Sequence, residues 1–94
     1  MIFEWDERKN RSNMQKHGVS FETALFVFDD PEHIVMYDED SSVEHGEDRY
    51  IAIGEVGKVL YVVYTERGEK TRLISARLAD SSERRDYYEQ NGYL

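Results

Sequence analysis

The spacing of apolar residues changes near Pro31, from a helical repeat before it to strand-like runs after it. One apolar helix face, with i, i+3, i+4, i+7 spacing, is formed by Phe21, Ala24, Leu25 and Phe28. Ser20 stands where an N-cap belongs, and Pro31 cannot continue a helix. The pattern therefore predicts a helix that begins after Ser20 and ends before Pro31.

A second helix and a short strand are predicted closer to the N-terminus. In "MIFEW" the apolar residues Ile2 (or Phe3) and Trp5 have the spacing of a strand, and this segment can form a short first strand. Asp6 is a suitable N-cap for a helix that runs to about His17, with Glu7 in its first turn. Gly18 follows at the position where a glycine commonly ends a helix.

Beyond Pro31 the chain has the pattern of a strand meander. The predicted strands are "HIVMY" (33–37), "RYIAIGEV" (49–56), "KVLYVVYTE" (58–66) and "KTRLISARLA" (70–79). Turns around Gly57 and Gly68 separate the last three strands, and the acidic loop "DEDSSVEHGED" separates the first two. The run "VLYVVYT" is apolar on both faces, which predicts a central place in the sheet.

A final helix, "SSERRDYYEQN", completes the predicted order. Asp80 and Glu83 have the spacing of a capping box, and Gly92 ends the helix. The expected fold class is α+β, in a single domain over residues 1–94. We expect an antiparallel sheet of about four strands with a short additional N-terminal strand. Two N-terminal helices and one C-terminal helix are expected on one face of this sheet.

Composition limits the class of protein. A chain of 94 residues suits one domain, and 39% hydrophobic and 13% aromatic residues argue against disorder. The sequence has no cysteine, which excludes a disulfide framework and a zinc–thiolate site. It has no run of about eighteen apolar residues and no signal-peptide pattern. We therefore expect a cytoplasmic protein with no membrane partner.

The net charge of -8 is unevenly distributed along the chain. Residues 29–48 contain nine acidic residues and no lysine or arginine, whereas the other 74 residues contain twelve basic and eleven acidic residues. Six of the twelve basic residues lie in the stretch 67–85. A solvated acidic loop explains the charge of residues 29–48. The functional alternative is that the acidic and basic segments form two faces that bind two different partners.

Arginines in the stretch 67–85 are candidate ligands for phosphate. Arg72 and Arg77 flank the apolar centre of one strand, and an offset of five places them on opposite faces unless a bulge intervenes. Arg84 lies in the first turn or two of the last helix, with Tyr87 and Tyr88 at i+3 and i+4 on the same side. Guanidinium and phenol groups bind phosphates and stack on bases. The alternative is ordinary surface pairing with Glu66, Glu69, Glu83 and Asp86.

Two other kinds of site have weaker support. His17, His33 and His45 lie among carboxylates, but they lack helical ligand spacing, and the acidic loop lacks the pattern of a calcium loop. We therefore expect no bound metal and no cofactor. The chain also has no G-x-S-x-G elbow and no glycine-rich phosphate loop, and Ser75 lies within a strand.

Seven motifs in this order resemble the BrnT family of type II toxins, which are small RelE-like ribonucleases. They are "FEWD" (3–6), "KHGVSFETA" (16–24), "VFDDP" (27–31), "EDRYIAIG" (47–54), "VVYTERG" (62–68), "RLISAR" (72–77) and "ERRDYYE" (83–89). The resemblance covers nearly the whole chain. It implies a ribonuclease that needs no metal and arrests translation, together with a BrnA-like antitoxin that covers the toxin and binds operator DNA.

Metal-independent cleavage of RNA uses the 2′-hydroxyl of the substrate as nucleophile. The enzyme must remove the proton of that hydroxyl, stabilise the negative phosphorane and protonate the leaving 5′-oxygen. The expected catalytic residues are Arg67, Arg72, Arg77, Lys16, His17 and Glu66. Arg84 and Tyr87 are the expected RNA-binding residues. Arginines suit the phosphorane because their forked donors match phosphate oxygens. His17 and Glu66 compete as bases, and Lys16 and Tyr87 are alternative acids.

The alternative to an enzyme is a protein-binding function. The chain can be the protein-binding subunit of a repressor complex, without an enzymatic role, and its acidic segment can then engage a basic segment of the partner. This hypothesis predicts no cleavage of RNA and operator binding only by the complex. Trp5, Phe21 and Phe28 are interpreted as core residues.

Overall fold

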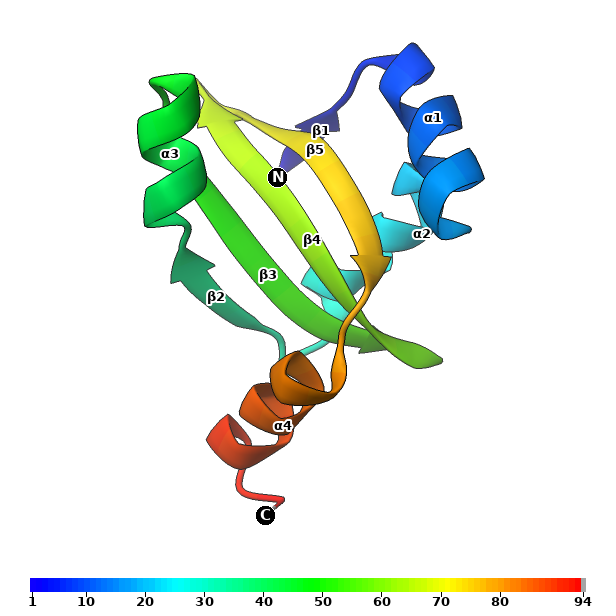
Figure 1. The fold of residues 1–94 in the computed structure, drawn as a ribbon, viewed down its shortest axis with the longest axis vertical. Helices are drawn as coiled ribbons and strands as arrows, with labels where there is room; N and C mark the ends of the chain where they lie inside the picture. Colours follow the sequence, from blue (N-terminus) through cyan, green and yellow to red (C-terminus); the bar gives the residue numbers. More distant parts are fainter. Residues whose placement is uncertain (94) are drawn as a thin grey trace.

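A computed structural model describes residues 1–93 and shows a mixed sheet of five strands, in the order β1-β5-β4-β3-β2 (Figure 1). The strands are β1 (Ile2–Glu4), β2 (Ile34–Tyr37), β3 (Arg49–Val56), β4 (Lys58–Arg67) and β5 (Lys70–Leu78). The strands β2 to β5 form an antiparallel meander, and β4 lies at the centre of the sheet, as its two apolar faces predict.

Four α-helices and one 3₁₀-helix occur within residues 1–93. They are α1 (Glu7–His17), α2 (Phe21–Ala24), the 3₁₀-helix η1 (Leu25–Asp29), α3 (Glu39–His45) and α4 (Ser81–Gln90). The predicted limits of α1 are confirmed, because the Asp6 side chain caps its N-terminus and Gly18 adopts the left-handed conformation after it. The predicted capping box of α4 between Asp80 and Glu83 is also present.

Each face of the sheet has its own apolar cluster. The back face is defined by the buried residues Ala52, Val62, Leu73 and Ala76, and it packs against Phe21, Ala24 and Val27 of α2 and η1. The close approach of η1 to β3 requires a glycine at position 54. A Cβ atom added at Gly54 would lie 2.9 Å from Cγ1 of Val27.

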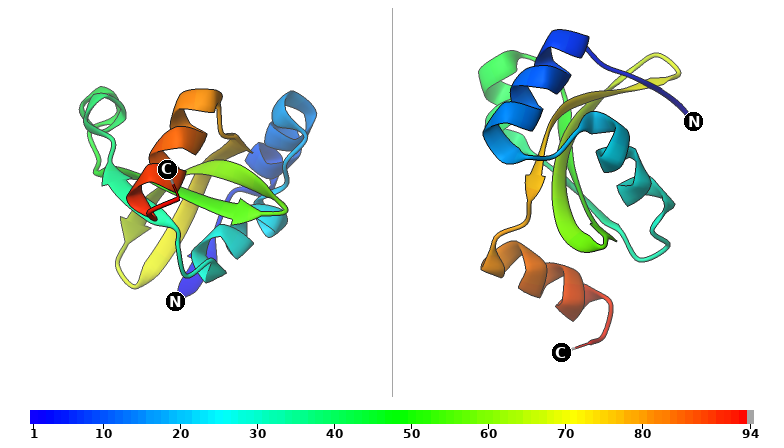
Figure 2. Two further views of the ribbon diagram at one scale, coloured as in Figure 1. Left: turned by 90° about the horizontal axis from the view of Figure 1, so that it is seen from below. Right: turned by 90° about the vertical axis from the view of Figure 1, so that its right-hand side faces the viewer.

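The front face of the sheet is covered only at its ends. Tyr87 of α4 packs with Ile53 and Val59 at one end, and α3 lies near the other end (Figure 1). The right-hand view of Figure 2 shows α4 below the strands rather than over their middle. The middle of the front face, around Tyr61 and Val63, therefore has no helix above it in the described part of the chain.

Asn13 of α1 completes the edge of β5 beyond the short β1. Its amide nitrogen donates to the carbonyl of Ala76 at 2.7 Å, and its Oδ1 accepts from the N–H of Ala76 at 3.1 Å. The amide thus supplies the two hydrogen bonds that a neighbouring strand would make. This buried contact fixes α1 beside β5 and joins residues 63 positions apart.

The expected antiparallel sheet is wrong, because β1 pairs with β5 in parallel. Ile2 is opposite Lys70 and Glu4 is opposite Arg72, so the sheet is mixed and has five strands. The two strands that pair lie at the two ends of the chain, and local apolar alternation carries no information on their relative direction.

The expected set of helices is also wrong. The acidic loop contains α3, which begins after the Asp38 cap and ends at Gly46. The second N-terminal helix is a single α-turn that continues as η1. Its buried residues, Phe21, Ala24 and Val27, recur every three positions, which matches the 3₁₀ repeat. The helices also contact both faces of the sheet rather than one.

Candidate nucleic-acid interface

A β-bulge brings Arg72 and Arg77 to the front face together. The register of β4 and β5 shifts by one residue, so that Ile74 and Ser75 both lie opposite Val63. One extra residue reverses the alternation of side chains beyond it. Arg72 and Arg77 are five positions apart in sequence, but the bulge absorbs one of those positions. Their side chains therefore lie on the same face, as they would at an even separation in a regular strand.

Burial of the intervening residues agrees with this geometry. Leu73 and Ala76 both pack in the back-face cluster although three positions separate them, which regular alternation does not allow. Arg72 follows the buried Thr71, and Arg77 follows the buried Ala76. Both guanidinium groups are thus carried on the face that lacks a helix over its middle.

The strand register places two more arginines on the same face as Arg72 and Arg77. Arg49 of β3 lies opposite Thr65 of β4, and Thr65 lies opposite Arg72. Arg67 is two residues beyond Thr65 and therefore shares its face. We define the arginine face as the front-face surface that carries Arg49, Arg67, Arg72 and Arg77.

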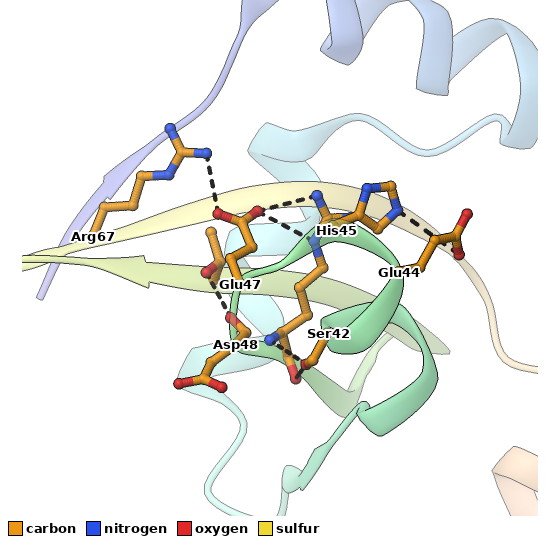
Figure 3. Close-up of polar contacts among 8 residues, drawn as sticks. Ser42, Glu44, His45, Glu47, Asp48 and Arg67 are labelled. Carbon is orange, nitrogen blue, oxygen red and sulfur yellow. Dashed lines mark hydrogen bonds and ion pairs between the residues drawn. The ribbon is translucent and has the colours of Figure 1, made fainter.

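Each arginine of this face contacts a carboxylate from a neighbouring element. Nη1 of Arg72 lies 3.2 Å from Glu4 of β1, and Arg77 makes a two-point pair with Glu83 of α4 at 2.7 and 2.9 Å. Glu47 contacts Arg49 at 3.1 Å and Arg67 at 3.4 Å. Figure 3 shows the carboxylate of Glu47 directed at Arg67. The carboxylates position the guanidinium groups and occupy donors that a phosphate would use.

The pairs alter the proton affinities of their members. Burial alone would raise the pKa of Glu47, but hydrogen bonds from Arg49 and the charge of Arg67 hold that pKa below its usual value. The hydrogen bonds to Glu83 raise the pKa of Arg77. The Arg77 guanidinium also lies 4.0 Å from the ring centre of Tyr61, a cation–π contact. Glu47 and Arg77 are therefore both charged at neutral pH.

Lys16 and His17 lie beside the segment of β5 that separates Arg72 from Arg77. The two side chains line a cavity of about 240 Å³ together with Ser75, and the cavity also includes Lys9. The other lining residues are Ser12, Asn13 and Ile74, so that no carboxylate lines it. The geometry therefore places two lysines and a histidine at the edge of the arginine face.

The remaining predicted residues lie elsewhere. Glu66 accepts hydrogen bonds from Thr71, which is buried on the back face, so Glu66 is on the opposite side from the arginines. Arg84 donates to the carbonyl of Ala79 at 2.9 Å near the start of α4. Tyr87 is buried and donates to Asp30, and burial raises its pKa far above the usual value. Tyr87 therefore offers no surface for base stacking.

Sequence reasoning missed Arg49 and Lys9. Arg49 is the first residue of a predicted strand, and its alternation with the apolar Tyr50 could have marked its face once β3 was paired with β4. Lys9 lies seven positions before Lys16, a spacing that keeps two side chains on one face of a helix. Neither the alternation at Arg49 nor the spacing of Lys9 and Lys16 identifies a site residue until the neighbouring strand is known.

The structure also bears on other kinds of site. Among residues 1–93, no group of three His, Asp or Glu side chains is arranged to hold a metal ion. No helix in that part of the chain has the length and apolar character needed to cross a membrane. The arginine face and the cavity lined by Lys9, Lys16 and His17 gather cationic side chains on and beside β5, a composition that suits a polyanion.

Comparison with models of known protein families identifies the family of the chain. A family model described as "Ribonuclease toxin, BrnT, of type II toxin-antitoxin system" matches residues 5–83. The matched range contains α1, the whole antiparallel meander and the first turn of α4. No individual curated protein matches the chain significantly.

Proposed function

Because the chain belongs to the BrnT family of ribonuclease toxins of type II toxin–antitoxin systems, we propose that its arginine face cleaves RNA without a metal ion. The observation that carries this proposal is the bulge at Ile74, which gathers Arg72 and Arg77 on one open face beside the cavity lined by Lys16 and His17. Cleavage of cellular RNA then arrests translation in the cytoplasm.

The arginines bind the scissile phosphate and stabilise its transition state. The 2′-oxygen attacks phosphorus, the bond to the 5′-oxygen breaks, and a cyclic phosphate remains on the first product. Arg67, Arg72 and Arg77 hold the two negative oxygens of the phosphorane, because forked N–H donors match that geometry. A phosphate reaches these donors by displacing Glu4, Glu47 and Glu83 from their ion pairs.

Lys16 and His17 carry out the proton transfers. Histidine exchanges protons near neutral pH, so His17 takes the proton of the 2′-hydroxyl. Lys16 protonates the leaving 5′-oxygen. Glu66 has no part in this proposal, because its carboxylate lies on the back face with Thr71.

An antitoxin partner neutralises the chain, as the family description implies. We propose that this partner is a BrnA-like protein. It covers the toxin, and the complex rather than the toxin alone binds operator DNA. The nine acidic residues between 29 and 48 support this division of roles, because so negative a segment does not attract nucleic acid by itself.

The test compares purified wild type with an Arg72→Ala/Arg77→Ala variant on single-stranded RNA in the presence of EDTA. The wild type should cleave RNA, and the double variant should lose kcat/KM by about 100- to 1000-fold, because it lacks donors that stabilise the transition state. An Arg85→Ala variant removes a charge from the exposed surface of α4 and should cleave like wild type.

Equal cleavage by wild type and the double variant would place the active site elsewhere. If neither protein cleaves RNA and the antitoxin complex still binds operator DNA, the chain is a protein-binding subunit of a repressor. Growth after induction, with and without the antitoxin, provides the parallel measurement in cells.

A further inference from the structure

The strand β2 leaves one row of backbone groups unpaired. The N–H of Asp38 donates to the carbonyl of Arg49 at 2.9 Å, so residues 34, 36 and 38 direct their backbone groups toward β3. Val35 and Tyr37 alternate with them and direct their N–H and C=O groups to the outside of the sheet. No hydrogen bond from the described part of the chain reaches these four groups.

The side chains along this edge are apolar and exposed. Val35 is 50% exposed and Tyr37 is 51% exposed, on the same face of the sheet. Soluble proteins usually protect edge strands, as Asn13 does for β5 in this chain. The edge of β2 has no such protection, and it is therefore able to pair with another strand.

The charge around the edge determines what can bind there. The segment 29–48 contains β2 and nine acidic residues, and it has no lysine or arginine. Among residues 1–93, only Glu44 and Glu47 of these nine lie within ion-pair distance of a basic side chain. The other seven are Asp29, Asp30, Glu32, Asp38, Glu39, Asp40 and Asp48. A second copy of this edge would bring two such segments together, and their like charges would repel.

We propose that the edge of β2 binds an extended segment rich in lysine and arginine from the antitoxin, as a sixth strand of the sheet. Main-chain hydrogen bonds to Val35 and Tyr37 supply the pairing, and the acidic residues that directly follow β2, Asp38, Glu39 and Asp40, select a basic segment. This inference rests on the antitoxin partner of the proposed function. It does not depend on whether the arginine face cleaves RNA.

Hydrogen exchange of the wild-type chain is the first test, with a purified BrnA-like antitoxin as the probe. In the free chain the amides of Val35 and Tyr37 should exchange fast, whereas those of Met36 and Asp38 should already be protected by β3. Saturation with the antitoxin should slow exchange at Val35 and Tyr37 by about tenfold or more. Unchanged exchange at both amides in the saturated complex would overturn the proposal.

Two variants distinguish the contribution of the Val35 backbone N–H to antitoxin binding from that of its side chain. Val35→Pro removes an N–H that points to the outside, which edge strands tolerate, and should weaken antitoxin binding in calorimetry by about tenfold or more. Val35→Ala keeps that N–H and should bind within about threefold of wild type. Circular dichroism verifies that both variants fold. Equal binding by Val35→Pro and wild type would contradict strand addition.

The charge requirement has its own pair of variants. Asp38→Asn/Asp40→Asn preserves the N-cap of α3, because asparagine caps as well as aspartate. It should weaken antitoxin binding by about threefold to tenfold at low salt. Glu69→Gln/Glu89→Gln removes the same charge at exposed positions elsewhere and should have little effect. Equal effects of the two pairs would refute selection by the segment 29–48.

The oligomeric state tests the other occupant of the edge. Light scattering should show a monomer for the free chain. A free dimer that Val35→Pro dissociates, without any change in antitoxin binding, would assign the edge to a second copy of this chain and overturn the proposal.

Discussion

Asp30 joins three parts of the fold through one carboxylate. Its Oδ2 accepts from the hydroxyl of Tyr87 in α4 and from the N–H of Glu55 in β3, and its Oδ1 accepts from the N–H of Glu32. Burial alone would raise the pKa of Asp30, but these hydrogen bonds hold the pKa below its usual value. A charged Asp30 therefore stabilises the folded chain.

We expect Asp30→Asn to lower the free energy of unfolding at pH 7 by about 1–3 kcal/mol, because an amide cannot accept all three bonds. The folded-state pKa lies below the unfolded value near ~3.9, so the carboxylate's contribution is complete above that value. It is lost as the pH falls through the lower folded pKa. Urea unfolding at several pH values measures the difference from wild type.

The control for Asp30 is Asp29→Asn, at an exposed residue whose side chain makes no hydrogen bond among residues 1–93. It should unfold like wild type at every pH. A gap between Asp30→Asn and wild type that is as large at pH 3 as at pH 7 would show that ionisation of Asp30 does not stabilise the fold.

Sequence reasoning predicted the residue types of the candidate site better than the directions of the side chains. Pairing of the arginines with the nearest carboxylates along the chain was the alternative to phosphate binding, and Glu83 does pair with Arg77. Arg72 instead contacts Glu4, which lies 68 positions away. Tyr87 turns into the core to reach Asp30, which lies 57 positions away. Local spacing contains no information on partners at such separations.

At the scale of elements, α3 had signals that its charge density obscured. Asp38 and Gly46 stand at the two caps, acidic residues occupy the first turn, and His45 occupies the last turn. This arrangement complements the helix dipole. The segment nevertheless has one apolar residue, Val43, which is 78% exposed, so no amphipathic repeat marks it as a helix.

The bulge in β5 was foreseen only as a condition for the two arginines to share a face. No residue of "RLISAR" requires a bulge, since it lacks glycine and its residues all suit a regular strand. Packing favours the bulge. Two residues separate Leu73 from Ala76, and both of these side chains reach the back-face cluster only when the bulge absorbs one of the two. Burial of the whole sheet thus determines where the arginines point.

We expect deletion of Ile74 to replace the bulge with regular alternation and to keep Arg72 and Arg77 on one face. Without Ile74 the two arginines are four positions apart, so both stay on the front face, while Leu73 and Ala76 stay on the back face. Cleavage of RNA should therefore stay well above the level of an Arg77→Ala variant. Ile74→Val keeps the length of β5 and should cleave like wild type. Cleavage by the deletion variant as low as that of Arg77→Ala would show that the bulge does more than place the two arginines on one face.

At the scale of the whole molecule, the chain separates its charges between two edges of one sheet. The acidic segment 29–48 includes the edge strand β2, whereas Lys9, Lys16 and two arginines lie around β5. Glu47 is the exception, since it reaches Arg49 and Arg67. The net charge of -8 therefore does not describe the surface that an RNA would meet.

Affinity for RNA should consequently depend on salt through the arginine face. Each phosphate contact with a single strand contributes about -0.7 to the slope of log affinity against log salt. Arg72→Ala should make that slope shallower by about 0.7, and Arg85→Ala should leave it unchanged. Fluorescence anisotropy with a 2′-O-methyl RNA, which cannot be cleaved, measures both slopes. Equal slopes for wild type and Arg72→Ala would exclude a phosphate contact at Arg72.

The parallel pairing of β1 with β5 also sets the order in which a newly made chain can fold. The strand β1 is synthesised first, but it cannot pair until β5 has been synthesised, since β5 lies between β1 and β4. The same holds for α1, whose Asn13 needs the backbone of Ala76. Such distant contacts form slowly. A nascent toxin therefore cannot assemble its arginine face on the ribosome that makes it until synthesis is almost complete.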